Sequence, residues 1–360
     1  MDKTWIVMVN SDCNLRCKYC FEDKTNKTNS VSNIKIYMDN IIRSLLDSPG
    51  NAVVDLFGGE PFLHLPLLDE VTDYFMDEAE KYNVQDRYMF NLTTNGTLFN
   101  NDSAKAFIKK ISGNCHVGFS IDGPRHIHDV NRVTIDGNGS YDKAVEGFHI
   151  CKEYIPIQRL SAKATINHAT MHDWETIVRH LLDLGFKRVG ANVVFEETWG
   201  EEEFYILAPQ FINVAEYLYS NNLLHEIEVD QINKGYSIAL SHPDSTSNSC
   251  GACIHMRCLG IDGKVYGCQK FGSVTGMPHL GEIKDGDIVI TNSNIISEVT
   301  NSRKYLDKYC ADCLFKAMCY NCVADAYAIG ISVDEMYSRK SQCGYTCAKG
   351  FTKLYLLNRE

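Results

Sequence analysis

The first two thirds of the chain alternate between short apolar runs and amphipathic segments. Trp5 to Val9 is an unbroken apolar run, which is typical of a buried strand. Apolar residues between Ile34 and Leu45 then recur three and four positions apart, the spacing of one helix face. The same alternation predicts strands near 52–57, 87–93, 115–121, 159–166 and 187–194, with helices near 66–82, 103–112, 140–154 and 171–184.

This alternation amounts to six strand–helix units, which favour an α/β fold with a parallel sheet covered by helices. Six units are fewer than the eight of a closed barrel, so we expect an open, partial (β/α)6 barrel. A further helix pattern near 208–222 would close this part. In barrels of this type the chemistry lies at the carboxyl ends of the strands.

The stretch Ser241 to Ser249 is polar and rich in turn-forming residues, so we place a domain boundary there. Beyond it the regular periodicity fades and cysteines become frequent, which is typical of a small core held together by metal sites. The pattern therefore predicts a barrel over 1–240, a small cysteine-rich domain over 241–347 and a C-terminal helix within 348–360.

Composition narrows the class of protein. The net charge of −11 leaves no basic surplus for binding phosphates, which argues against a nucleic-acid partner. No signal peptide is visible, and no apolar run reaches the roughly 18 residues of a membrane span, so we expect a cytoplasmic protein. In such a protein the 15 cysteines, 13 of which lie in two clusters, indicate metal sites rather than disulfides. Cys115 and Cys151 stand alone and are expected to be ordinary buried residues.

Cys13, Cys17 and Cys20 directly follow the first strand. Three thiolates can hold three irons of a [4Fe–4S] cube and leave the fourth iron without a protein ligand. Such an iron can chelate S-adenosylmethionine (SAM), and reductive cleavage then yields a radical that abstracts hydrogen from an unactivated carbon. A zinc site, or a fragment of another motif, is the competing interpretation.

The run CNLRCKYCFE resembles the signature of the radical SAM superfamily. In that family a GGEP turn after the second strand binds the methionyl ammonium, and a carboxylate is suited to pair with it. The resemblance extends to TNG at 94–96 and to FSIDGP at 119–124. It implies a set of SAM-binding residues: Tyr19, Gly58, Gly59, Glu60, Asn95, Ser120, Asp122, Arg132 and Lys163. For Lys163 a surface or structural role is an open alternative.

The later cysteines, with Gly263 between Cys253 and Cys268, resemble a SPASM domain, although the gap between Cys319 and Cys322 is one residue shorter than usual. The resemblance implies two auxiliary [4Fe–4S] clusters and therefore three clusters in all. One would take Cys253, Cys268, Cys322 and perhaps Cys250, and the other Cys310, Cys313, Cys319 and either Cys343 or Cys347. Two zinc ribbons are the competing interpretation.

The resemblance implies a polypeptide substrate. One branch, the anaerobic sulfatase maturases, forms formylglycine and has an aspartate, thought to be the catalytic base, where this chain has Gln269. An amide is not a useful base at neutral pH, so we favour the other branch, which forms thioether or carbon–carbon crosslinks in ribosomally made peptides. A non-catalytic scaffold or an electron-transfer protein is a minor alternative.

The partners expected for such an enzyme follow from this function. They are a short cysteine-containing precursor peptide and a reductant such as flavodoxin or ferredoxin. Because the first strand begins at Trp5, we expect leader recognition to be absent, supplied by a separate leader-binding protein, or done by the barrel itself. The acidic run Glu196 to Glu203 is a candidate peptide-facing loop, with an ordinary solvated loop as the alternative.

Overall fold

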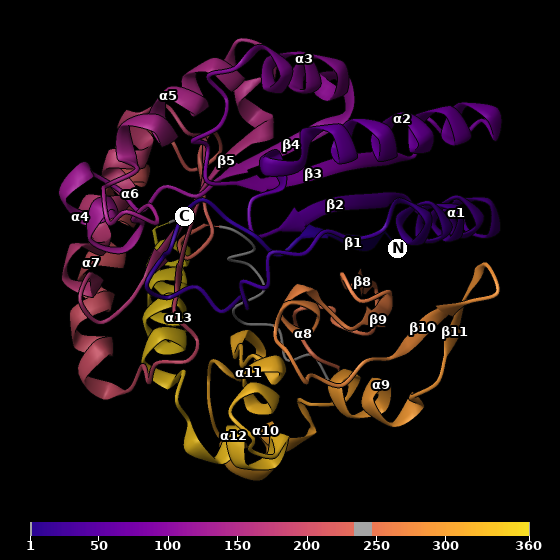
Figure 1. Ribbon diagram of the computed structural model, residues 1–360. Helices are drawn as coiled ribbons and strands as arrows, with labels where there is room; N and C mark the ends of the chain where they lie inside the picture. The colour runs from indigo at the N-terminus through magenta and orange to yellow at the C-terminus, as the bar shows by residue number, and fades with distance from the viewer. Residues whose placement is uncertain (1, 234–246, 360) are drawn as a thin grey trace.

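Six strand–helix units open the chain, in the order that the hydrophobic pattern predicts. The computed structural model describes residues 2–233 and 247–359 (Figure 1). The units are β1 (Lys3–Asn10) with α1 (Val31–Asp47), β2 (Ala52–Gly58) with α2 (Leu65–Lys81), β3 (Tyr88–Thr94) with α3 (Asp102–Ile111), β4 (Cys115–Phe119) with α4 (Arg125–Asn131) and α5 (Tyr141–Lys152), β5 (Leu160–Ile166) with α6 (Trp174–Asp183), and β6 (Arg188–Val193) with α7 (Glu201–Ser220).

The strands of these units form a parallel sheet that does not close into a barrel. Strands β1 to β6 lie in sequence order, and a short strand, β7 (Glu228–Val229), pairs in parallel with β6 at one edge. Figure 1 shows the helices α1 to α7 along the outside of the curved sheet. The predicted partial α/β barrel is therefore confirmed.

The cysteine-rich region continues this sheet. Strand β8 (Met256–Leu259) runs parallel to β1, with Ile6 opposite Cys258, and is followed by β9 (Lys264–Tyr266), β10 (Gly281–Lys284) and β11 (Asp287–Ile290). Gly263, at φ +78°, makes the turn between β8 and β9. The free edge of β1 is thereby covered, which removes an exposed row of backbone donors and acceptors. Of the expected boundary at 241–249, residues 241–246 lie outside the described residues.

Short helices complete the C-terminal region. They are α8 (Gln269–Ser273), α9 (Ser293–Thr300), α10 (Lys304–Cys310), the 3-10 turn η6 (Lys316–Met318), α11 (Val323–Ala328), α12 (Val333–Arg339) and the longer α13 (Cys343–Leu357). The 3-10 turns η1 (Pro61–His64), η2 (Ser112–Asn114), η3 (Ile157–Arg159) and η4 (Met171–Asp173) lie in the barrel. Figure 1 shows α13, in yellow, beside α7 of the barrel.

Two helices begin earlier than the hydrophobic pattern predicts. Helix α7 begins at Glu201 instead of near 208, because carboxylates are stabilising in the first turn of a helix and Glu203 accepts a hydrogen bond from the Gly200 backbone N–H (2.7 Å). Part of the acidic run read as a loop is therefore helical. Helix α13 begins at Cys343 instead of near 348, which puts Cys343 and Cys347 one turn apart on the same helix face.

The strand faces differ in polarity. Alternate residues of β2 and β3, such as Val54, Leu56 and Leu92, are buried against the helices, whereas Asp55 and Asn91 face the interior of the curved sheet. The interior of the partial barrel is therefore polar. None of the helices within residues 2–233 and 247–359 has the length and apolar composition that a membrane crossing requires.

Candidate active site

A cavity of about 620 Å³ lies within the curved sheet, below the loops at the carboxyl ends of its strands. Its size is that of a small-molecule site. The cavity extends from the Cys13–Cys20 loop to the start of the C-terminal region. Its lining includes, of the residues expected to act, Cys13, Cys17, Tyr19, Cys20, Gly58, Gly59, Glu60, Asn95, Ser120, Arg132, Lys163, Cys250, Cys268, Gln269 and Cys322.

The three N-terminal cysteines lie in one loop between β1 and α1. Backbone hydrogen bonds hold this loop against the segment after α4: the Arg16 N–H donates to the carbonyl of Val133 (2.7 Å), and the Lys18 N–H donates to that of Asn131 (3.1 Å). Leu15 anchors the loop, since its side chain is buried in the core. The loop backbone is thus fixed on both sides of Cys17.

Burial dominates the ionisation of these thiols. It raises the pKa of Cys13 to about 12 and raises that of Cys17, while the Arg132 guanidinium partly opposes the shift at Cys17. Among residues 2–233 and 247–359, no three His, Cys, Asp or Glu side chains converge as ligands of one metal ion would. A [4Fe–4S] cluster makes a different demand, because its cysteines bind separate irons and need not converge on one point.

Glu60 is the most constrained acid of the cavity wall. Its carboxylate accepts hydrogen bonds from the Asn95 backbone N–H (2.7 Å), the Thr94 hydroxyl (2.8 Å) and the Phe62 backbone N–H (3.2 Å). Burial raises its pKa to about 7, and no lysine, arginine or histidine of the described residues pairs with it. A carboxylate has about four acceptor positions, so one remains for a cationic group of a ligand.

The GGEP turn contacts the start of the cysteine loop directly. A Cβ on Gly58, whose φ is +151°, would lie 2.4 Å from the carbonyl oxygen of Asn10, and one on Gly59 would lie 2.1 Å from that of Asp12. Only glycine permits this approach. The Asn10 amide also donates to the carbonyl of Glu60 (3.0 Å), so the turn and the cysteine loop form one unit.

Asn95 joins the third strand to the same loop. Its side-chain amide donates to Asn14 (2.8 Å) and lies 3.9 Å from the Cys13 sulfur. Ser120 also lines the cavity. Lys163 extends across the interior: its Cε lies 2.7 Å from where a Cβ on Gly118 would be, and its charge lowers the pKa of Asp55, which burial raises to about 6.

Asp122 differs from the other expected SAM-binding residues, because it lies behind the cavity wall. The carboxylate is buried, accepts hydrogen bonds from the Tyr19 hydroxyl and the Thr165 backbone N–H (2.9 Å), and lies 3.0 Å from Nε of Arg132. The Arg132 guanidinium also stacks over the Tyr19 ring, 5.4 Å from its centroid. Asp122 therefore positions Tyr19 and Arg132, both of which line the cavity.

The C-terminal cysteines gather into two groups. In the inner group, burial raises the pKa of Cys268 to about 12, and the neighbouring Cys250 and Cys253 thiols add to the shift. Cys322 is a neighbour of Cys268, and its pKa is raised mainly by burial. Cys250, Cys268 and Cys322 line the cavity, so this group faces the same space as the N-terminal cysteines.

The outer group contains the remaining expected ligands. Burial raises the pKa of Cys319 to about 12, with Cys343, Cys310 and Cys313 as neighbouring thiols, and Cys347 lies close to Cys313. Cys343 also neighbours Cys310, Cys347 and Cys313. Both Cys343 and Cys347 thus lie in this group. Cys258, on β8, is fully buried in an apolar cluster.

Lys270 is a residue that the sequence patterns do not single out. It follows Gln269 in α8 and forms ion pairs with Glu196, in the loop after β6, and with Asp325 of α11. Its ammonium also lies over the ring of Phe21, 5.0 Å from the centroid, next to Cys20. Lys270 therefore ties the cysteine loop, the barrel and the C-terminal region together. No sequence motif marks it, because its partners lie more than 50 residues away.

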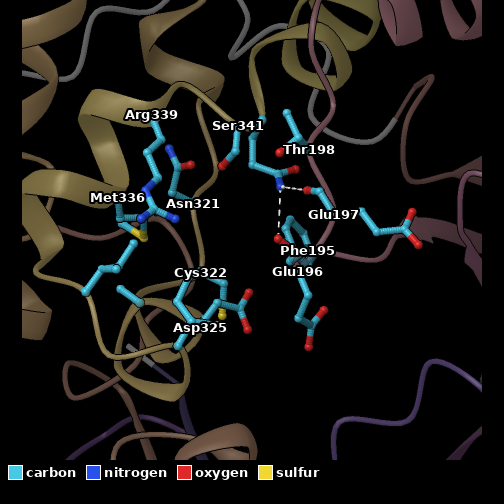
Figure 2. Close-up of a pocket in the computed structure, with 14 residues that line it drawn as sticks. Phe195, Glu196, Glu197, Thr198, Asn321, Cys322, Asp325, Met336, Arg339 and Ser341 are labelled. Carbon is cyan, nitrogen blue, oxygen red and sulfur yellow. Dashed lines mark hydrogen bonds between the residues drawn. The ribbon is translucent and has the colours of Figure 1, made fainter.

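A second, smaller pocket adjoins the cavity at this place. Figure 2 shows its labelled side chains, which come from the loop after β6, from α11 and α12, and from the segment that precedes α13. Phe195, Glu196 and Cys322 line both spaces, so the two lie side by side and share these residues in their walls.

Comparison with known proteins identifies the N-terminal part. The sequence model of the Radical SAM superfamily matches residues 7–184, from β1 to the end of α6. The chain contains a radical SAM domain. The domain implies a [4Fe–4S] cluster and SAM, and it makes this protein an enzyme of that superfamily.

Similar proteins include maturases. The cysteine-type anaerobic sulfatase-maturating enzyme of Clostridium perfringens (strain 13 / Type A) is 26% identical over 329 residues, 86% of this chain and 85% of that protein. The structure titled native anSMEcpe with bound AdoMet aligns with a TM-score of 0.73 at 18% identity, over 99% of this chain and 100% of that one. Streptococcus suis SuiB bound to precursor peptide SuiA aligns with a TM-score of 0.58 at 13% identity, over 91% and 73%. At these identities the structural matches establish the shared fold.

The residues around the radical SAM loop fit a cluster and SAM. Three thiols face one cavity, and the buried Glu60 carboxylate has a free acceptor position and no cationic partner in the described chain. A buried carboxylate without a countercharge is costly, and a ligand ammonium would compensate it.

Proposed function

We propose that this radical SAM enzyme is a peptide maturase. It abstracts hydrogen from a ribosomally made peptide and joins two of its residues through a thioether or a carbon–carbon crosslink. The similarity to maturases along most of the chain supports a polypeptide substrate. The observation that favours a crosslink is Gln269, an amide that lines the cavity beside Cys268.

The cofactors would lie at the N-terminal end of the cavity. Cys13, Cys17 and Cys20 would hold the [4Fe–4S] cluster, and Glu60 would pair with the ammonium of SAM. When bound, the two supply a 5′-deoxyadenosyl radical that abstracts hydrogen from an unactivated carbon. Asn95, Ser120 and Lys163 line the space where the rest of SAM would lie, with Lys163 available for its carboxylate.

Other residues of the wall would orient SAM. Tyr19 and Arg132 are held by Asp122, so the aromatic ring and the guanidinium keep fixed positions beside the adenine end. Gly58 and Gly59 let the GGEP turn pack against the cysteine loop, which fixes Glu60 relative to Cys13. Preorganisation of this kind lowers the cost of ordering the site when SAM binds.

The C-terminal cysteines would hold two auxiliary [4Fe–4S] clusters in a SPASM domain. The inner cluster would take Cys250, Cys253, Cys268 and Cys322. The other three thiols all neighbour Cys268, and this proximity supports full ligation by four thiolates. The outer would take Cys310, Cys313, Cys319 and either Cys343 or Cys347. Cys250, Cys268 and Cys322 line the cavity, so a cluster held by them would supply an electron acceptor beside the place where the substrate would lie.

Gln269 bears on the choice of reaction. Formylglycine formation in the sulfatase-maturase branch is thought to use an aspartate at this position as base, and an amide does not accept a proton usefully. Glu196, another acid of the cavity wall, is already paired with Lys270.

Formylglycine formation is the second candidate. It is favoured by one observation: the sulfatase-maturating enzyme of C. perfringens is similar over 86% of this chain. If this candidate holds, the substrate is a sulfatase segment with a cysteine.

The partners follow from the reaction. We infer a short cysteine-containing precursor peptide and a flavodoxin or ferredoxin as reductant. A cytoplasmic location would keep the cysteines reduced before cluster assembly.

The product of the reaction distinguishes the candidates. The test peptide is the one encoded by a short cysteine-containing reading frame beside the gene, incubated anaerobically with enzyme, reductant and SAM. A thioether removes two hydrogens and protects one cysteine from alkylation, whereas a carbon–carbon crosslink removes two hydrogens and leaves every thiol open. An aldehyde captured on a sulfatase-derived cysteine peptide would contradict the crosslink and establish the second candidate.

A further inference from the structure

The smaller pocket lies where the barrel and the C-terminal region meet, and hydrogen bonds join its two sides. The Trp199 backbone N–H donates to the carbonyl of Ser341 (2.6 Å). The side-chain amide of Gln342 donates to the carbonyls of Phe195 (3.2 Å) and Glu197 (3.3 Å), as the dashed lines in Figure 2 show. These bonds hold the loop after β6 against the segment before α13, so the pocket of about 290 Å³ is preformed.

Two kinds of side chain line this pocket. Ala326, Ile329, Ile331 and Met336 form an apolar wall, and the carboxylates of Glu196 and Asp325 pair with Lys270, which lines the large cavity. An apolar wall that ends in carboxylates matches a long aliphatic side chain with a cationic head, which buries its stem and keeps its charge paired. The volume suits about one such side chain.

The acidic end carries more negative than positive charge. Glu196 and Asp325 share a single ammonium, that of Lys270. Asp325 is only 7% exposed, and its Oδ2 accepts no hydrogen bond from a nitrogen or oxygen atom in the described part of the chain. The Cys322 thiol lies beside it. An underpaired carboxylate at this depth favours a cationic ligand.

The other charged groups of the pocket do not reverse this balance. Arg339 forms an ion pair with Glu335 one helical turn away (2.7 Å), so its charge is already matched. Within residues 2–233 and 247–359, the only ion-pair partner of Glu197 is His168 (3.5 Å), which is charged only when protonated. The net charge of the lining therefore remains negative.

We propose that this pocket binds a lysine or arginine side chain of the peptide substrate, next to the residue that enters the large cavity. The proposal rests on the proposed function, because it takes the substrate to be a peptide. Because the two spaces share Phe195, Glu196 and Cys322 in their walls, they lie close enough for neighbouring residues of one peptide to reach both. The pocket thereby selects peptides with a basic residue beside the modified one.

Capped amino acids test the pocket without the natural peptide. Nα-acetyl-lysine N-methylamide, and its norleucine and glutamate counterparts, are titrated into the reconstituted enzyme under anaerobic conditions and followed by saturation-transfer NMR. Norleucine has the same aliphatic stem without the charge. We expect the lysine probe to bind about fivefold more tightly than the norleucine probe, as one half-buried ion pair allows. Equal binding of the lysine and glutamate probes overturns the proposal.

Two substitutions with opposite expected effects locate the binding. Glu196→Gln should weaken the lysine probe about fivefold, and Arg339→Gln, which leaves Glu335 unpaired near the pocket, should strengthen it about twofold. Glu202→Gln removes an acid of α7 outside the pocket and serves as the matched control. Unchanged binding in Glu196→Gln contradicts the proposal.

A bulky substitution separates this pocket from other acidic places. Met336→Trp should fill the pocket and abolish binding of the lysine probe while SAM cleavage continues; persistent binding overturns the proposal. If the unmodified enzyme does not cleave SAM at all, the proposed function is contradicted instead. An enzyme that cleaves SAM and modifies a peptide but does not discriminate the lysine probe contradicts only the pocket assignment.

Discussion

The N-terminal cysteines and the inner group of C-terminal cysteines face the same cavity, and they are brought there by different means. Cys13, Cys17 and Cys20 lie within one loop, and local backbone hydrogen bonds fix that loop. The nine C-terminal cysteines outside β8 lie between Cys250 and Cys347, and tertiary packing of several short helices brings them together. A local motif can therefore be assigned from spacing alone, whereas a dispersed ligand set depends on the fold around it.

The largest expected effect is the loss of SAM cleavage when the N-terminal cysteines, and not the outer C-terminal ones, are removed. Replacing Cys13, Cys17 and Cys20 together by alanine should abolish SAM cleavage, because no ligands remain for the cluster that donates the electron. The matched variant, Cys310, Cys313 and Cys319 to alanine, should still form 5′-deoxyadenosine. Chromatography of anaerobic reactions measures the product. Cleavage that survives the first change would remove the distinction between the two regions.

The sequence predicts the barrel half of the molecule well. Strands such as β2 and β5 are long enough for their pattern to be read, and the motifs follow strands whose carboxyl ends meet at one cavity. One functional detail is not predicted in this way. Asp122 belongs to the FSIDGP motif but lies behind the cavity wall. Its carboxylate is bonded to Tyr19, Thr165 and Arg132 instead.

The C-terminal half is harder to predict. Strands β8 to β11 are three or four residues long and carry no readable period, so their addition to the barrel sheet is not foreseen. The links of Lys270 with Glu196 and Asp325 join segments distant in sequence, and no local pattern encodes them. Short elements held by long-range contacts are the ones that sequence periodicity misses.

Glu60 tests how the N-terminal site binds its ligand. Glu60→Gln should weaken SAM binding by roughly 1.5–3 kcal/mol, the range for a hydrogen bond to a charged group. Asp55→Asn is the matched control, since Asp55 is also a buried acid of the cavity wall but is bonded to Asn91 (2.6 Å). Isothermal calorimetry measures both affinities. Equal losses in the two variants would mean that Glu60 acts only through the fold.

The pH dependence of SAM binding sharpens the role of Glu60. Burial raises its pKa to about 7, so the carboxyl is partly protonated near neutral pH. A bound ammonium favours the charged form and lowers that pKa, so SAM binding should release protons around pH 7 and weaken as the pH falls below 7, by at most about tenfold per unit. Calorimetry in buffers of different ionisation enthalpy measures the release. If the Glu60→Gln variant releases the same number of protons on SAM binding, the release comes from another group.

Substitutions at Cys250 and Cys258 allow a proposed cluster ligand to be compared with a core residue of the same C-terminal region. Cys250→Ala should alter the electron paramagnetic resonance signal of one auxiliary cluster, because that cluster loses one of four thiolates. Cys258→Ala should leave all signals unchanged and lower the free energy of unfolding by about 1 kcal/mol, as loss of a small buried group does. A crystal structure with the Cys250 sulfur remote from every iron would contradict the first expectation.

The iron content of the two regions tests the central claim most directly. After anaerobic reconstitution we expect about twelve iron atoms per chain, four for each of three clusters. The variant without Cys13, Cys17 and Cys20 should retain about eight, and the variant without Cys310, Cys313 and Cys319 should also retain about eight. A content of about four irons in the unmodified chain, with zinc bound to the C-terminal cysteines, would contradict the assignment of two auxiliary clusters to that region.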